Sequence, residues 1–385
     1  MLIVPLDEAR PGMKLAAPVA HPDNPFQDLL RSGYELEDSV LDRMRSIGVP
    51  FIYVEYPALD SLDRHLAVQL SPARQEIYKK IKASITQVQK ETRSCVSYSD
   101  YCSATRDLIE ALLTQGQNPI YLDQMSRQGG DAVAHASAVA HLSLLLGLKS
   151  EQYLIDQRSR LPPNRAKDVV NLGVAGMMHD LGVSKLREEL QQYSDADPPE
   201  DPIDRAEWET HAQIGYEMIR NDVEATAAAS VYQHHQHFDG SGFPKRPNGG
   251  GDAAAMESEK IHVFARIIQC ANLHDRLSSP VGKRPRRRNV EIYRLMQANY
   301  AGWCDPQIVR VLQMIAPPYP PGSRLRLTDG SRVIVKESNA NAPLKPVVQR
   351  LAEDDWTPVG EAIDLRLPGA PAIEGSADAA AAMAA

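Results

Sequence analysis

The stretch His234-His-Gln-His-Phe-Asp-Gly-Ser-Gly-Phe-Pro244 decides the fold of this chain. It joins two adjacent histidines, at the end of a predicted helix, to a glycine-rich turn that closes on proline. Imidazole is the commonest side-chain ligand of metal ions, and glycine and proline favour a tight turn behind it. We therefore interpret the histidine pair as metal ligands. The motif residues of the turn are Asp239, Gly240, Gly242, Phe243 and Pro244.

Further histidines and polar residues fall on separate predicted helices or helix ends. They are Asp131, His135, His179, Asp180, His211 and Asn272. Helical spacing places several of them on inward, largely apolar faces, and a buried polar group needs a partner. Histidine and carboxylate side chains from several helices bind divalent metals, and one pocket can hold more than one ion. For the remaining histidines an ordinary surface or core role is the simpler interpretation: His21, His65, His141, His237, His262 and His274.

The middle of the chain has the apolar spacing of helices. Apolar residues recur at intervals of three and four over residues 107–316, which predicts a mainly α protein built on one large helical domain. Residues 61–106 are predicted to form a charged helical connector before it. Residues 1–60 are predicted to form a small α/β unit, with strands at 2–4, 14–19 and 51–54 and a helix at 37–47.

After the helical domain the spacing changes to a period of two. Residues 324–336 alternate about Asp329-Gly330, which is a strong β-hairpin pattern. We expect a β-rich extension over residues 317–366. The final residues 367–385, rich in alanine, glycine and proline, are predicted to be disordered because they cannot bury enough apolar surface to fold.

Composition argues against several classes of protein. The net charge of −8 argues against a DNA-binding protein, which needs a surplus of lysine and arginine. No run approaches the roughly 18–20 apolar residues of a membrane span, and the N-terminus has no signal-peptide pattern. The four cysteines show no disulfide or metal-binding spacing. These features predict a cytoplasmic protein with reduced thiols.

Four motifs, in order along the chain, resemble those of the HD-GYP family within the HD superfamily. Met178-His-Asp-Leu-Gly182 resembles the HD signature, and residues 234–244 are similar to HHExxDGxGYP. His211-Ala-Gln-Ile-Gly215 resembles the intervening His-xxx-Gly element, and residues 265–277 are similar to ARIIxxADxxDAL. The resemblance covers about residues 115–315. It implies an HD-superfamily helical bundle, flanked by the small N-terminal α/β unit and the C-terminal β-hairpin extension.

The resemblance also implies a function. It implies a metal-dependent phosphodiesterase that hydrolyses cyclic di-GMP or a related cyclic dinucleotide in bacterial second-messenger signalling. Two or three divalent ions, iron or manganese, would supply the attacking hydroxide without a protein nucleophile. A diguanylate cyclase partner and a homodimer are compatible with it. The implied metal-site residues are Asp131, His135, His179, Asp180, His211, His234, His235 and Asn272.

The sequence departs from the family pattern at several positions. Val183 replaces a phosphate-binding lysine, with Lys185 as the candidate substitute. Asn272 replaces a ligand aspartate, and Asp275, one turn later, could partly compensate for it, although a supporting or capping role is the simpler interpretation of Asp275. Gln236 replaces a glutamate that is expected to accept a hydrogen bond from a ligand histidine. Phenylalanine at the position of the GYP tyrosine removes one hydroxyl.

A basic run follows the last motif. Residues 283–288 resemble the family's RPYR element, so Arg284 and Arg287 are candidates to bind substrate phosphates. A solvated loop or a weak nucleic-acid patch is the simpler alternative. The departures leave two further functions open. One is a degenerate, non-catalytic relative that binds nucleotide or a partner protein, and the other is a broader HD phosphohydrolase acting on nucleotides or phosphomonoesters.

Overall fold

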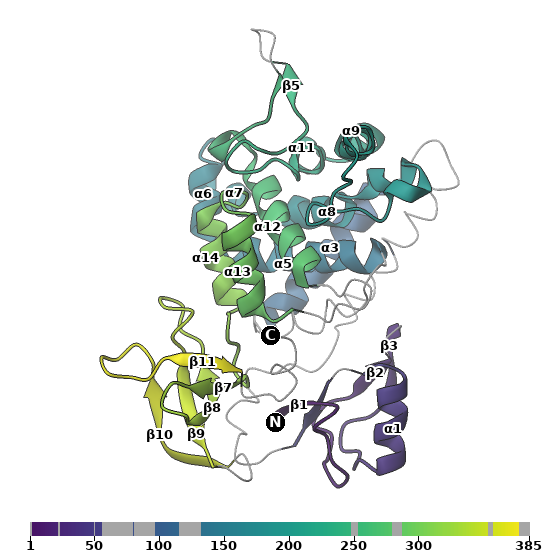
Figure 1. The fold of residues 1–385 in the computed structure, drawn as a ribbon. Coiled ribbons are helices and arrows are strands. Elements are labelled where there is room, and N and C mark those ends of the chain that lie inside the picture. Colours follow the sequence, from purple (N-terminus) through teal and green to yellow (C-terminus); the bar gives the residue numbers. More distant parts are fainter. Residues whose placement is uncertain are drawn as a thin grey trace. The chain divides into compact units, whose positions relative to one another are not determined.

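The computed structural model describes residues 2–21, 24–49, 51–55, 80, 97–114, 132–247, 253–278, 287–352 and 357–376. The described residues form two units. One unit combines the residues up to 55 with those from 316 onward, and the other contains the residues between them. Figure 1 shows that the second unit is helical. The prediction of a mainly α protein with a β-rich C-terminal part is confirmed.

The helical unit carries the residues singled out from the sequence. Within its described residues, three short 3-10 helices interrupt it: η3 (Leu181–Lys185), η4 (Glu188–Leu190) and η5 (Ser258–Lys260). A small ribbon pairs β5 (Arg246–Pro247) with β6 (Ala253–Ala254). The described α-helices are α3 (Tyr98–Thr114), α5 (Ala132–Lys149), α6 (Glu151–Gln157), α7 (Pro163–Ala166), α8 (Val170–Met178), α9 (Pro202–Glu209), α10 (His211–Ile219), α11 (Ala225–Gln233), α12 (Val263–Ser278), α13 (Asn289–Asn299) and α14 (Pro306–Ile315).

Helix α5 is the core of the helical unit, and it packs against α8 and α12 (Figure 1). Every residue from His135 to Gly147 is buried. A Cβ added at Gly176 of α8 would lie 2.9 Å from the Cα of Ala140, so glycine lets the two helices approach closely. Among the described residues, α5 alone has the length and hydropathy of a membrane span, and 78% of that window is buried inside the protein.

The first unit begins with short strands and one helix. Strand β1 (Leu2–Pro5) pairs antiparallel with β4 (Phe51–Val54), and β2 (Val19–His21) pairs with β3 (Asn24–Leu30). Helix α1 (Asp38–Ser46) buries its apolar face in the same core. The sequence predicted the strands of the β1–β4 pair and this helix. The strand expected at 14–19 is reduced to isolated bridges at its start, and β2 begins only at its last residue.

The C-terminal part of this unit is a five-stranded antiparallel sheet with the order β10-β9-β8-β7-β11. Its hairpin turns at Asp329-Gly330, as predicted, and Gly330 has a φ of +82° that favours glycine. Alternate residues of β8 face two cores: Val333 packs within the sheet's own core and Ile334 packs with residues of the N-terminal part. The five strands are β7 (Arg324–Leu327), β8 (Arg332–Glu337), β9 (Val347–Leu351), β10 (Pro358–Asp364) and β11 (Ile373–Ser376).

The structure differs from the sequence prediction at the end of the chain. The sheet continues beyond residue 366, because β11 pairs with β7 in a segment for which disorder was expected. Most of the predicted helical connector, residues 61–106, lies outside the described residues, as do residues 377–385. The domain limits proposed from the sequence are otherwise untested.

Candidate metal centre

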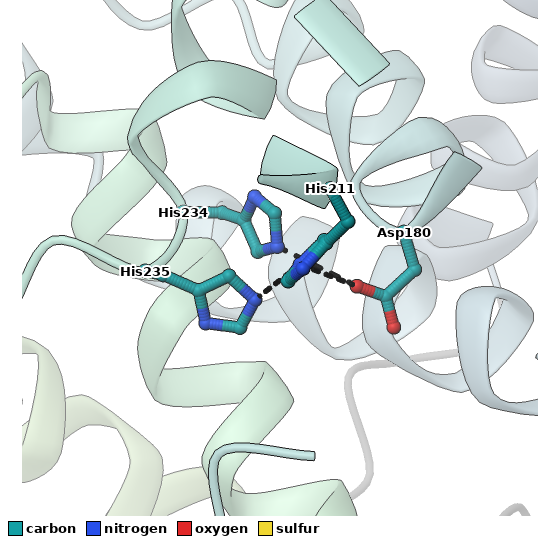
Figure 2. Close-up of side chains that lie close together, drawn as sticks. All are labelled: Asp180, His211, His234 and His235. Carbon is teal, nitrogen blue, oxygen red and sulfur yellow. Dashed lines mark hydrogen bonds and ion pairs between the residues drawn. The ribbon is translucent and has the colours of Figure 1, made fainter. Parts of the chain in front are cut away.

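Five histidines and one aspartate meet at the ends of four helices of the helical unit. His135 lies in the first turn of α5, and His179 and Asp180 directly follow α8. His211 is the first residue of α10, and the pair from the sequence motif directly follows α11. Figure 2 shows Asp180, His211, His234 and His235 turned toward one another. The structure therefore brings together side chains that are up to a hundred residues apart in the sequence.

Asp180 stands between two groups of imidazoles. Its Oδ2 lies 3.5 Å from Nε2 of His135 and 3.4 Å from Nε2 of His179. Its Oδ1 lies 3.7 Å from Nε2 of His211 and 3.5 Å from Nε2 of His234. The donor atoms form two sets, one of Asp180, His135 and His179 and the other of Asp180, His211, His234 and His235. We call them the first and the second subsite.

Backbone carbonyls fix the orientation of three of the rings. The Nδ1 of His179, His211 and His234 lies 2.9, 2.6 and 2.6 Å from the carbonyl oxygen three residues earlier. A carbonyl oxygen only accepts hydrogen bonds, so Nδ1 of each ring carries the hydrogen. The neutral ring then has its lone pair on Nε2, the atom that faces Asp180. This tautomer is the one that binds a metal through Nε2.

Two carboxylates fix the other rings. Asp275 Oδ2 lies 2.7 Å from Nδ1 of His135, and Asp195 Oδ2 lies 2.7 Å from Nδ1 of His235. Both carboxylates are buried. A carboxylate that accepts from the far nitrogen of a ligand histidine holds the ring and strengthens its lone pair as a donor. Each subsite therefore contains one histidine supported in this way.

The inward-facing atoms suit a cation. Nε2 of His211 lies 2.8 Å from Nε2 of His235, and Nε2 of His179 lies 3.2 Å from Nε2 of His135. Two lone pairs at these distances repel each other, and a cation between them removes the repulsion. The amide oxygen of Asn272 is also buried and accepts no hydrogen bond from the described residues. Imidazole donors suit transition metals such as iron or zinc better than magnesium or calcium.

Burial keeps three of the imidazoles neutral, those of His135, His211 and His235. Burial, with the Arg276 guanidinium as the next cause, lowers the pKa of His135 to about 4. Burial and the neighbouring His235 lower the pKa of His211 to about 3. The same effect holds the pKa of His235 well below its usual value. Neutral imidazole is the metal-binding form, so these rings need not lose a proton before binding at neutral pH.

Asp180 is a charged carboxylate at the centre of this group. Burial alone would raise its pKa, but the groups around it, the Arg276 guanidinium among them, outweigh burial and hold the pKa well below the usual value. Nη2 of Arg276 donates to Oδ2 of Asp180 at 2.8 Å. The site thus has one fixed negative charge between its two subsites.

The glycines of the sequence motifs allow close approach between the segments that carry these residues. A Cβ added at Gly182 would lie 2.0 Å from the carbonyl oxygen of His211 and 2.6 Å from the nitrogen of Gly215. One added at Gly242 would lie 2.2 Å from the carbonyl oxygen of His235. No side chain fits at these distances, so the backbone contacts that bring His211 and His235 to the site require glycine.

The turn after the histidine pair supports it from behind. Asp239 Oδ1 accepts from the backbone nitrogen and hydroxyl of Ser241, and Gly240 has a φ of +81°. The Phe243 ring stacks on His235 with centroids 4.5 Å apart. Pro244 O accepts from the amide of Gln236. The motif residues therefore shape and pack the loop.

One role expected from the sequence is wrong. Gln236 does not accept from a ligand histidine: its Nε2 donates to the carbonyl of Pro244 and its Oε1 accepts from the backbone of Met256. It ties the motif loop to the segment before η5. The histidine-supporting role belongs instead to Asp195, in an acidic loop that the sequence did not single out, and to Asp275.

The remaining predicted residues lie at the edge of the site or outside the described residues. Asp131 and Arg284 belong to segments that the structure does not describe. Asn272 lies on α12 and is buried. Lys185 is exposed at the end of η3, and Nη1 of Arg287 donates to the carbonyl of Leu277 near the end of α12. The phosphate-binding roles of these two cations stay predictions.

Comparison with known proteins identifies the domain. A family model described as an HD domain matches residues 155–308. A similar solved structure is that of Bd1817, an HDG"Y"P protein from Bdellovibrio bacteriovorus. It is 16% identical, covers 81% of this chain and 98% of that chain, and has a TM-score of 0.45. No curated protein matches the chain. The resemblance found in the sequence is confirmed: the chain contains an HD domain, the domain of a superfamily of metal-dependent phosphohydrolases.

Proposed function

We propose that this protein is a metal-dependent phosphodiesterase that hydrolyses cyclic di-GMP or a related cyclic dinucleotide. One observation carries the proposal: Asp180 presents one carboxylate oxygen to each of two imidazole groups. A carboxylate shared between two neighbouring cation sites is the arrangement that two-metal phosphoester hydrolases use. His135 and His179 would hold one ion, and His211, His234 and His235 the other.

The chemistry assigned to the protein is positioning. Bound divalent ions would lower the pKa of water and take up charge on the phosphoryl oxygens. The Nδ1 hydrogen bonds of His179, His211 and His234 keep each of these rings in the tautomer whose Nε2 lone pair is free to bind a metal. Burial excludes water from behind the rings. Nothing in the described part of the site resembles an activated serine or cysteine nucleophile. This fits hydrolysis by water rather than through a covalent intermediate.

The substrate class rests on the sequence motifs. The HD and GYP-like motifs frame the two subsites, and cyclic dinucleotides are the substrates that the resemblance implies. Two or three ions of iron or manganese are proposed on the same ground, whereas a cytoplasmic location is proposed from the composition. So are a diguanylate cyclase partner and a homodimer. Lys185, Arg284 and Arg287 are proposed to contact phosphate, and Asp131 and Asn272 to extend the metal site.

The alternative function is binding without catalysis. In that case the protein is a degenerate relative of the family that binds nucleotide or a partner protein. Two observations favour it: Val183 stands where the family has a phosphate-binding lysine, and the neutral amide of Asn272 replaces a carboxylate. Fewer charges at the site weaken both metal and substrate binding. This alternative predicts nucleotide binding without turnover.

Anaerobic incubation with cyclic dinucleotides tests the proposal. Protein loaded with iron or manganese is expected to release linear dinucleotide or mononucleotide. His179→Ala is expected to abolish turnover and lower metal content, whereas His141→Ala, a buried change on α5 outside both donor sets, leaves metal content unchanged. Binding without product in every metal form would establish the non-catalytic alternative. Hydrolysis of phosphomonoesters but no cyclic dinucleotide would indicate the broader phosphohydrolase.

A further inference from the structure

An arginine that the sequence analysis did not single out lies against the central aspartate. Arg276 follows Asp275 on α12, and its Nη2 donates to Oδ2 of Asp180 at 2.8 Å. Oδ2 is the oxygen that also faces His135 and His179. The guanidinium therefore lies beside the first subsite, whereas the three histidines of the second subsite have no arginine or lysine contact among the described residues. The ARIIxxADxxDAL motif of the family has alanine at this position.

Exposure indicates which side of the site Arg276 occupies. The side chains of Arg276 and Asp180 are 28% and 14% exposed, whereas those of His179, His211 and His234 are 0% exposed. Among these side chains, solvent touches the arginine and the aspartate but not the three histidines. A phosphate that approaches them from solvent would meet the guanidinium beside the first subsite.

The chemistry of guanidinium fits phosphate. It is planar, always charged and carries five N–H donors, and its bond to Asp180 is its single hydrogen bond among the described residues. Arginine binds phosphate oxygens with two parallel hydrogen bonds. Val183 cannot make such a contact, and Lys185 is exposed in the turn after the HD motif. Arg276, by contrast, contacts Asp180, the carboxylate that faces both subsites.

We propose that Arg276 is a phosphate-binding residue of this centre, held ready by Asp180, and that its charge makes the first subsite the weaker of the two for metal. This inference rests on the proposed function in assuming a phosphate-bearing substrate. The guanidinium occupies one lone pair of Oδ2 and repels a divalent ion held by His135 and His179. An incoming phosphate would offset that positive charge.

Titration calorimetry on the full chain tests the proposal, with manganese and inorganic phosphate as the probes. Phosphate binding to manganese-loaded protein is expected to weaken about tenfold or more in Arg276→Ala, because a charge-assisted hydrogen bond is lost. Arg276→Lys should recover part of the affinity. The matched control is Arg294→Ala, an exposed arginine of α13, which should bind phosphate like the wild type.

The manganese titration separates this role from a structural one. Removing the guanidinium should tighten the weaker of the two manganese sites, whereas loss of a structural support would loosen it. Wild-type phosphate affinity in Arg276→Ala, no phosphate binding by the wild type, or weaker manganese binding in the variant would overturn the proposal. If Arg276 binds phosphate but no cyclic dinucleotide is cleaved, the proposed function fails and this inference stands. If cyclic dinucleotide is cleaved but Arg276→Ala binds phosphate as the wild type does, the proposed function stands and this inference fails.

Discussion

The two buried carboxylates behind the metal centre allow the two subsites to be weakened one at a time. Asp195 accepts from His235 and Asp275 accepts from His135, each at 2.7 Å. His235 belongs to the second subsite and His135 to the first. We predict that Asp195→Ala lowers the affinity for one of two bound ions and that Asp275→Ala lowers the affinity for the other.

The size of the effect follows from the lost hydrogen bond. A hydrogen bond to a charged group contributes about 1.5–3 kcal/mol, which is about 10- to 100-fold in affinity at about 1.4 kcal/mol per tenfold change. Asp195→Asn keeps an acceptor of the same shape without the charge, so this variant should lose about tenfold or less of the affinity for the metal ion. Burial raises the pKa of Asp195, which neighbouring histidines partly counteract, so the difference in metal affinity between the wild type and Asp195→Asn should shrink at low pH.

Anaerobic manganese titration measures this directly. The wild type should give two binding steps, and each alanine variant should shift one step and leave the other. The double variant should shift both steps. If either single variant weakened both steps equally, or neither step moved, the division into two subsites with separate supporting carboxylates would be refuted.

Three further predictions concern packing, pH and substrate contact. Gly182→Ala places a Cβ against the carbonyl of His211, so we expect unfolding by denaturant to show about 1–3 kcal/mol or more of lost stability. In Gly375→Ala the added Cβ meets nothing within 4 Å, so the free energy of unfolding should change little. The metal-free protein should lose stability as the pH falls from about 6.5 to about 4, because the unfolded chain binds protons that buried His135, with its pKa of about 4, does not. Val183→Lys should lower the KM for a cyclic dinucleotide, measured by product formation, without changing metal content.

The residues of the site could be predicted from the sequence to a large extent. Five histidines and Asp180 stand on helical faces or in motifs, and helix geometry brings them together. The helical spacing and the HD-type motifs were enough for this, because a buried imidazole on an apolar face requires a partner. Asp275 was recognised as a supporting residue because it lies one turn from Asn272 on the same helix.

Two contributors could not be found in the same way. Asp195 lies in an acidic, proline-rich loop, where nothing local separates it from Asp197 or Asp201, and it meets His235 only through the tertiary fold. Arg276 follows Asp275 directly, and its contact with Asp180 depends on the orientation of α12. Contacts across long sequence separations carry no periodic pattern, and only the folded arrangement reveals them.

The fold shows the same division between local and long-range information. The hairpin at Asp329-Gly330 was predicted because its turn is encoded locally. The strands that complete the sheet were not, since β11 joins β7 from a segment rich in alanine, glycine and proline. Tertiary pairing there overrides a weak local preference for strand.

Metal analysis tests the central claim most directly. Protein purified without oxygen, as wild type and as Asp180→Ala, should be assayed for iron and manganese by elemental analysis, with circular dichroism to establish that both are folded. We predict about two ions per chain in the wild type, as in a two-metal site, and almost none in the variant, because Asp180 faces both imidazole groups. Equal metal content in two folded proteins would contradict the account.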